Sequence, residues 1–320
     1  MKKNIEIKEI FNKQGGLKLL QQYYYGGALK TAAAEFLILG KDRKALEILR
    51  MSAELKIKRK LEKKYIKKID AFNINYNAAL SHEQSNKVWV CWFQGLDNAP
   101  ELVRRCYQSL LDNLTDRDIV LITSSNMDRY VRFPQYIMKK WEAGKISNTH
   151  MTDLLRLELL INYGGMWIDA TVLCTSKRED IPEYFFNSDL FFYQALKPGR
   201  DGQSAFISSW LISASTNNRI LMLTRYLLYE YWLTHDEMVD YYLFHVFMCI
   251  ALEHNTDEWE KVVPRDNETP HILLLRLFNC YNERMFEFIT EQGPFHKLSY
   301  KFLPEQIEME NTYYKRIIAD

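Results

Sequence analysis

The sequence predicts an α/β protein with a mixed, mainly parallel sheet flanked by helices and preceded by an N-terminal helical segment. Short β-branched and aromatic runs alternate with helix-length segments from about residue 87 onward, as in βαβ units. Residues 1–80 instead show helical periodicity without strand signals. The 320 residues are 47% hydrophobic and 26% charged, which is ordinary for a globular protein. We therefore expect a helical segment at 1–80 and an α/β domain at 81–320.

The helical segment is strongly basic near its middle. Residues 28–39 are rich in Ala and Leu, and apolar residues recur at helical spacing among lysines from 45 to 69. Residues 41–68 contain twelve Lys or Arg and four Asp or Glu. This basic stretch has two interpretations, a peripheral contact with anionic lipid or a solvated helix face. The whole chain carries a net charge of only +1, so we expect no nucleic-acid partner.

The strands and helices of the expected domain follow in a simple order. A strand at 87–93 precedes a helix at 100–111, and a strand at 119–122 precedes a helix at 135–143. Ligands of such sheets bind beyond the carboxyl ends of the strands, so the loops after Phe93 and Ile122 are candidate binding loops. Further strands are expected at 166–172, 189–193 and 210–214, and further helices at 219–233 and 239–252.

Cysteine usage and hydropathy indicate the compartment. The five cysteines are widely spaced and include no CxxC pair, which argues against a disulfide scaffold and a structural zinc site. No uncharged apolar run reaches the roughly 20 residues of a membrane span, and no apolar signal core follows the first lysines. We expect a cytoplasmic protein, at the inner face of the plasma membrane if the basic stretch contacts lipid.

The stretch from Ser147 to Thr175 carries the most specific chemistry. A helix capped by one of residues 147–149 should run to Tyr163 and end at the glycine pair 164–165. This helix is apolar around most of its circumference, yet Asp153 and Arg156 share one stripe with Thr149 and Thr152. A buried carboxylate and guanidinium are costly unless paired. The pair either fixes the helix internally or serves a ligand.

Asp169 and Thr171 come where the next strand should end. Residues two apart on a strand face the same way, so the two side chains should point together. Their oxygens suit a hydrated divalent cation that also coordinates a diphosphate. The alternative is an aspartate that caps a turn at the end of a strand.

These residues together form a recognisable string: Thr152-Asp153-x-x-Arg156, then Gly164-Gly165-x-Trp167-x-Asp169-x-Thr171. The string resembles the (S/T)DxxR…GGxxxDxD core shared by a group of mannosyltransferases and by the large clostridial glucosylating toxins. The form GGMWIDATVLCT is most similar to the bacterial capsular polysaccharide synthesis family. The resemblance covers roughly residues 87–300 and implies a GT-A, Rossmann-like fold. Its flanking parts are the KVWxxWxQG run at 87–95, Cys106 with Ser109, Asn126 with Tyr130 and Pro134, and His296-Lys297-Leu298.

The resemblance also implies roles for individual residues. Asp153 and Arg156 would hold the ribose and the donor sugar or phosphates, and Asp169 would contact the donor sugar and ribose. The family's second aspartate ligates manganese, but Thr171 stands at that position here, which puts dependence on Mn2+ or Mg2+ in doubt. His296 is then a candidate metal ligand beside Asp169 and Thr171.

The remaining expectations concern the leaving group, the base and the reacting carbon. Lys297 would contact the leaving phosphate, although a solvated turn is the alternative for the His296–Lys297 pair. Trp92 would stack on uracil while the backbone near Gln94 reads its edge, although Trp92 could equally be core. Asp240, with Gln194, is a candidate for the group beneath the anomeric carbon or beside the acceptor hydroxyl.

The expected function is a retaining glycosyltransferase in capsular polysaccharide synthesis. It would move a hexose from a UDP-sugar, UDP-galactose or UDP-glucose first, to a polyprenyl-diphosphate-linked oligosaccharide. Two alternatives stay open. One is a sugar-phosphate transferase, which would release UMP. The other is a non-catalytic carbohydrate-binding or assembly scaffold, a reading that Thr171 keeps open.

Overall fold

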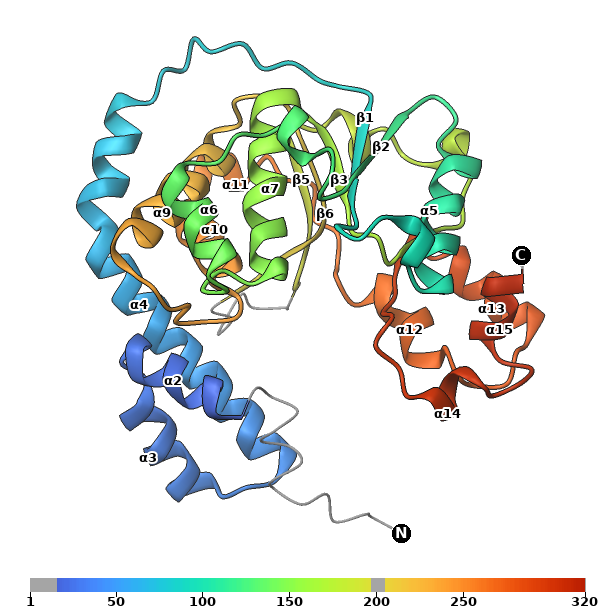
Figure 1. Ribbon diagram of the computed structural model, residues 1–320, viewed down its shortest axis with the longest axis horizontal. Helices are drawn as coiled ribbons and strands as arrows, with labels where there is room; N and C mark the ends of the chain where they lie inside the picture. The colour runs from blue at the N-terminus through green and yellow to red at the C-terminus, as the bar shows by residue number, and fades with distance from the viewer. Residues whose placement is uncertain (1–15, 197–204, 320) are drawn as a thin grey trace.

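The computed structural model describes residues 16–196 and 205–319, and its centre is a five-stranded sheet of order β2-β1-β3-β6-β5 (Figure 1). β1 pairs in parallel with both β2 and β3, whereas β6 runs antiparallel to both β3 and β5. Four of the five strands therefore share one direction, and the predicted mixed, mainly parallel sheet is confirmed. The strands are β1 (Lys87–Cys91), β2 (Asp118–Ile122), β3 (Gly165–Ile168), β5 (Leu190–Gln194) and β6 (Ile207–Ala214).

The single strand expected at 166–172 is divided in two. Val172 N donates to Asp169 O, 3.0 Å away, and this tight turn separates β3 from β4 (Val172–Cys174). β4 leaves the central sheet and pairs antiparallel with β7 (Phe295–Lys297), a short strand that the sequence did not reveal. The turn therefore brings residues 169–171 beside a segment from the end of the chain.

The two faces of the sheet are covered by different helices. Trp89 and Trp167 pack into the cluster that includes α7 (Asn148–Tyr163), α9 (Arg219–Thr234) and α10 (Leu243–Glu253). Val88 and Ile168, one residue away on the same strands, pack into the opposite cluster with α5 (Glu101–Asn113). This alternation is the period of two that a strand buried on both faces requires. The remaining helices are α2 (Leu17–Gly26), α3 (Leu29–Leu39), α4 (Arg43–Asn75), α6 (Gln135–Glu142), α8 (Tyr184–Asn187), α11 (Thr256–Trp259), α12 (Ile272–Arg276), α13 (Glu283–Thr290), α14 (Pro304–Ile307) and α15 (Tyr313–Ala319).

The N-terminal helices share a core with the α/β domain. α4 packs against α9 and α10, and its buried stripe from Leu49 to Ile69 joins their hydrophobic cluster. On the same side of α4, the buried Lys58 Nζ lies 2.6 Å from Glu253 Oε1 at the end of α10. Residues 1–15 of the expected helical segment lie outside the described residues. The boundary at 80/81 stays a prediction, but α4 is built into the larger body (Figure 1). The α4 stripe consists of Ala45, Leu49, Ala53, Ile57, Leu61, Tyr65 and Ile69.

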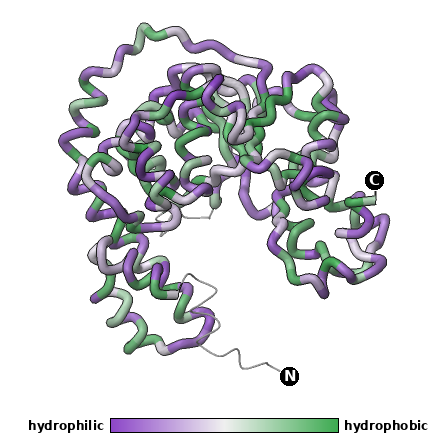
Figure 2. Tube along the Cα trace, in the orientation of Figure 1, coloured by the Kyte–Doolittle hydropathy of each residue, from purple (hydrophilic) through white to green (hydrophobic). Residues whose placement is uncertain are grey.

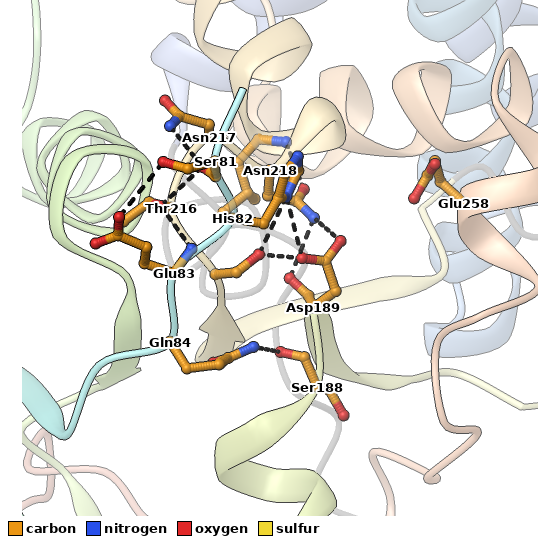
Figure 3. A network of polar contacts seen from close by, with 12 residues as sticks. Ser81, His82, Glu83, Gln84, Ser188, Asp189, Thr216, Asn217, Asn218 and Glu258 are labelled. Atoms are coloured by element: carbon orange, nitrogen blue, oxygen red, sulfur yellow. Dashed lines mark hydrogen bonds and ion pairs between the residues drawn. The ribbon is translucent and has the colours of Figure 1, made fainter. Parts of the chain in front are cut away.

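Polar contacts hold the segment that leads from α4 into β1 (Figure 3). Glu83 and Thr216 exchange hydrogen bonds, from Glu83 N to Thr216 Oγ1 (2.9 Å) and from Thr216 N to Glu83 O (3.0 Å). His82 Nδ1 lies 3.3 Å from Asp189 Oδ1, and Asn218 Nδ2 donates to Asp189 O at 3.1 Å. These residues precede β1 and β5 and follow β6. The network therefore anchors the amino edge of the sheet and leaves the carboxyl edge for ligands.

Candidate functional site

A cavity of about 910 Å³ lies at the carboxyl edge of the central strands. The loop after β1 and the turn after β3 contribute to its wall, together with the antiparallel strand β6, which begins at this edge. The loop after β2, the second loop that the sequence singled out, does not line the cavity. Helices α4, α7 and α10 and the C-terminal segment after β7 complete the wall. The residues used below are Glu54, Trp92, Gln94, Asp153, Arg156, Asp169, Thr171, Tyr241, His245, Lys297, Tyr300 and Lys301.

Helix α7 brings the predicted stripe to the cavity. Ser147 caps the helix by accepting from His150 N at 3.2 Å, and Gly164 ends it at a φ of 64°. Asp153 and Arg156 are 6% and 3% exposed, yet both belong to the cavity wall. The predicted sharing of one helix face is therefore confirmed.

Arg156 links α7 to the turn after β3. One terminal nitrogen lies 3.2 Å from Asp153 Oδ1 and donates to Ser209 O at 2.9 Å, and the other lies 3.5 Å from Asp169 Oδ1. The guanidinium carbon lies 4.9 Å from the Trp167 ring centroid, a cation–π distance. The internal ion pair, the first of the two interpretations, is therefore present, and both of its residues also line the cavity.

A buried histidine orients the Asp153 carboxylate. Trp232 Nε1, which can only donate, lies 3.0 Å from His150 Nε2. His150 Nε2 is therefore an acceptor, and the ring proton sits on Nδ1, 3.2 Å from Asp153 Oδ2. Both oxygens of Asp153 are held, one by His150 and one by Arg156. The carboxylate is fixed before any ligand arrives.

Asp169 stands at the centre of the charged groups. Trp167 Nε1 donates to its Oδ1 at 3.0 Å and Lys297 Nζ to its Oδ2 at 3.0 Å. Burial disfavours the charged carboxylate, but the Lys297 ammonium and the Arg156 guanidinium outweigh burial and hold the pKa of Asp169 below its usual value. Asp169 is therefore ionised at neutral pH. The three charged side chains that the sequence proposed as a unit do meet at one cavity wall.

The β4–β7 pairing determines which residue of the His296–Lys297 pair reaches the cavity. Lys297 lies opposite Val172, and its Nζ also donates to Thr171 Oγ1 at 2.6 Å. Adjacent strand residues face opposite ways, so His296 turns away. Its Nε2 lies 3.1 Å from Thr175 Oγ1, and burial lowers the pKa of the imidazole to about 4. The prediction that His296 ligates a metal beside Asp169 is therefore corrected.

The donor groups present do not make a protein cage for Mn2+ or Mg2+. Mg2+ is usually held by one or two carboxylates together with substrate phosphates and waters. Asp169 is the one carboxylate in the turn after β3, and Thr171 supplies only a hydroxyl, which already accepts from Lys297. Within residues 16–196 and 205–319, no three His, Cys, Asp or Glu side chains are grouped to hold a metal. The expected metal ligation by Asp169 and Thr171 stays a prediction that this geometry does not favour.

The tryptophan after β1 is placed for stacking, and its neighbour in the strand is not. Trp89 is fully buried and donates from Nε1 to Gly164 O at 2.9 Å, so it belongs to the core. Trp92 lines the cavity and meets the Tyr300 ring edge to face, with centroids 5.1 Å apart. Gln94 follows on the same wall. The predicted base site at Trp92 and Gln94 therefore has an aromatic floor from two distant segments.

The two residues predicted to lie beneath the anomeric carbon or beside the acceptor hydroxyl are outside the cavity wall. Asp240 Oδ1 accepts from Tyr242 N at 2.7 Å in the turn before α10, and burial raises the pKa of Asp240 to about 7. Gln194 is buried, and its Oε1 accepts from Trp259 Nε1 at 3.2 Å. The position of each residue corrects its proposed role beside the anomeric carbon or the acceptor.

Two residues that the sequence did not single out for the site do line the cavity. His245 on α10 lies near Asp153, Arg156 and Asp169, and burial lowers its pKa to about 4, so it is neutral at pH 7. The sequence does contain a signal for a buried polar site here, because His245 is the only polar residue from 243 to 248 in an otherwise apolar run. Glu54 reaches the wall from α4. No local sequence pattern identifies Glu54 as a cavity residue, because its position depends on how α4 packs against the domain.

Curated relatives match only a part of the chain. An O-glycosyltransferase named PaGT from Phomopsis amygdali is 23% identical over 145 residues, 41% of this chain and 35% of that protein. The O-glycosyltransferase braB from Annulohypoxylon truncatum is 33% identical over 103 residues, 29% of this chain and 24% of that protein. The matched segments thus span about a quarter to a third of the length of these relatives.

A solved structure and a family model give longer matches. The structure titled PaToxG Glycosyltransferase aligns with a TM-score of 0.35 and 13% identity, covering 82% of this chain and 95% of that chain. The family model described as capsular polysaccharide synthesis protein matches residues 41–317, from the start of the basic stretch to the last helix. This match covers most of the chain, and the chain belongs to the capsular polysaccharide synthesis protein family.

Proposed function

We propose that this protein is a retaining glycosyltransferase that moves a hexose from a UDP-sugar to a polyprenyl-diphosphate-linked glycan. The observation that supports it is the meeting of Asp153, Arg156 and Asp169 at one cavity wall, with Lys297 beside them. Family membership and the relatives named glycosyltransferases also support a glycosyltransferase. UDP-galactose and UDP-glucose are the donors that we propose first.

In the proposed reaction, the bond between the anomeric carbon and the β-phosphate oxygen breaks, and its electron pair leaves with UDP. The acceptor hydroxyl oxygen bonds to the same face of the anomeric carbon and releases its proton to a phosphate oxygen or to water. Positive groups that are already in position lower the activation free energy for departure of the diphosphate. Here Lys297 and Arg156 supply that positive charge. Asp153 and Asp169 would hold donor hydroxyls as well as the two cations.

A titration and a hydrolysis assay test the proposal. Calorimetry should detect UDP binding in preference to ADP and GDP, and incubation with UDP-galactose or UDP-glucose should release UDP and free hexose. Release of UMP would instead indicate a sugar-phosphate transferase. An absence of nucleotide affinity would indicate the non-catalytic scaffold.

Trp92→Ala serves as the site control for that titration. Loss of an aromatic stacking platform costs about 1–3 kcal/mol, so UDP affinity should fall about 5- to 150-fold. Trp92→Phe keeps an aromatic ring beside Tyr300 and should retain most of the affinity. Equal affinity in all three proteins would place the base elsewhere in the cavity.

We also propose a peripheral membrane contact at the corner between α3 and α4. The side chains of Leu37 and Ile38 are 83% and 76% exposed, and Figure 2 colours much of α3 as hydrophobic. Lys41, Arg43 and Lys44 follow directly and are exposed. Apolar side chains next to cations suit the surface of an anionic bilayer. Within residues 16–196 and 205–319, no helix combines the length and hydropathy needed to cross a membrane.

Vesicle co-sedimentation tests this contact. The protein should pellet with vesicles that contain phosphatidylglycerol at low salt, and less at high salt, because each surface cation contributes about 1 kcal/mol that salt screens. Leu37→Ser with Ile38→Ser should reduce the bound fraction severalfold. Leu275→Ser is the matched control, since Leu275 is 81% exposed outside this corner. Failure to bind at low salt would leave the basic stretch as a solvated helix face.

A further inference from the structure

Lys297 bridges the two oxygens that the sequence motif suggested as metal ligands, those of Asp169 and Thr171. Its Nζ lies 3.0 Å from Asp169 Oδ2 and 2.6 Å from Thr171 Oγ1. The backbone holds it there, since Lys297 pairs with Val172 across the β4–β7 ladder and Leu298 N donates to Thr171 O at 2.9 Å. The side chain is only 19% exposed. The ammonium is thus a fixed component of the wall.

A divalent ion and this ammonium compete for the same oxygens. Charges of like sign repel strongly a few ångströms apart in a partly buried site, and Arg156 adds a second positive group 3.5 Å from Asp169. Thr171 removes the carboxylate that would favour the metal. Thr171 and Lys297 therefore act together, because a neutral hydroxyl neutralises less of the lysine charge than a second carboxylate would and leaves that charge available to a diphosphate.

The lysine has the capacity to bind phosphate from this position. An ammonium has three N–H donors. Within the part of the chain that the structure describes, two of them serve Asp169 and Thr171, and the third is free to donate into the cavity. Lys301, four residues further along the same cavity wall, adds a second positive charge. A diphosphate that crosses the cavity would meet cations supplied by the chain itself.

We infer that this protein binds its nucleotide diphosphate without a divalent metal ion, and that the Lys297 ammonium, positioned by Asp169 and Thr171, takes the place of that ion. The inference rests on the proposed function for the identity of the ligand. It adds that the chain itself supplies the counter-charge for the diphosphate.

Calorimetric titration with UDP separates the possibilities. Wild-type protein should bind UDP with the same affinity, within about threefold, in EDTA and in Mn2+, and Mn2+ alone should give no heat of binding to the apo chain. Lys297→Met should weaken UDP binding about 10- to 100-fold in EDTA, the usual loss for a hydrogen bond to a charged group. Lys315→Met, which removes an ammonium from α15 outside the cavity, is the matched control. Circular dichroism confirms that both variants fold.

A designed variant tests whether a metal ion can take the place of the Lys297 ammonium. Thr171→Asp combined with Lys297→Ala removes the ammonium and supplies the second carboxylate. This protein should bind Mn2+ directly and should bind UDP only when Mn2+ is present. Wild-type binding that requires Mn2+, or rises tenfold with it, would overturn the inference and leave the proposed function intact. No UDP binding under either condition would instead defeat the proposed function.

Discussion

Asp169→Asn is expected to lower the rate of hexose transfer by about two to three orders of magnitude while leaving the fold intact. The carboxylate is the common partner of Lys297 Nζ, Arg156 and Trp167 Nε1. The amide keeps the size of the side chain but removes the charge that holds both cations in position. The loss of one prearranged electrostatic group at a reacting centre typically costs about 10²–10³ in kcat.

The measurement is the initial rate of UDP release from UDP-hexose by purified proteins at equal concentration. Asp180→Asn is the control, because Asp180 is exposed on the 3-10 turn Arg178–Asp180 and does not line the cavity. It should match the wild type. An Asp169→Asn protein with unchanged turnover would remove Asp169, and with it the proposed reaction centre, from the site.

Gly165→Ala is expected to cause the largest loss of stability of any single-methyl change discussed for this chain. Gly165 has a φ of +92°, and an added Cβ would lie far inside contact distance of the Lys87 carbonyl oxygen on β1. The positive φ alone costs about 1–2 kcal/mol for a residue with a side chain. Because the obstructing atom is backbone in the neighbouring strand, β3 would have to move away from β1. We expect a total loss of about 3 kcal/mol or more.

Urea unfolding followed by fluorescence measures this loss. Gly144→Ala is a matched control, since Gly144 has a φ of +71° but no heavy atom within 4 Å of the position of its Cβ. That variant should lose only the cost of the positive φ, about 1–2 kcal/mol. Equal losses in the two variants would show that the close approach of β3 to β1 is not what requires glycine at 165.

The parts of the site that lie close together in the sequence could be predicted from it. Asp153 and Arg156 share a helix face through the helical period, and the glycine pair marks where α7 ends and β3 begins. The turn that divides β3 from β4 was less visible, because Ala170 and Thr171 continue an apolar, β-branched pattern. The expectation that the Asp169 and Thr171 side chains point together was nevertheless correct, since both contact Lys297 Nζ.

Contacts between distant segments could not be read from local pattern. β7 has three residues and no periodicity to detect, so the choice between His296 and Lys297 depended on its register with β4. The alternation of strand side chains means that only one of two neighbours can face the cavity. Glu54 depended in the same way on the packing of α4 against α9 and α10. Asp240 was misjudged because a carboxylate in a turn gives the same sequence signal whichever way the turn faces.

Because α4 shares a core with the α/β domain, this helix sets a fixed distance between the α3–α4 corner and the cavity. At a rise of 1.5 Å per residue, its 33 residues span about 50 Å as one stiff rod, and Glu54 lies about 16 Å along the axis from Arg43. With the α3–α4 corner resting on lipid headgroups, this stretch of α4 would limit the distance from the bilayer to Glu54 on the cavity wall to about 16 Å, a distance that a lipid-linked glycan would have to span. The enzyme would then select acceptors by how far they protrude, in addition to the sugars that they display.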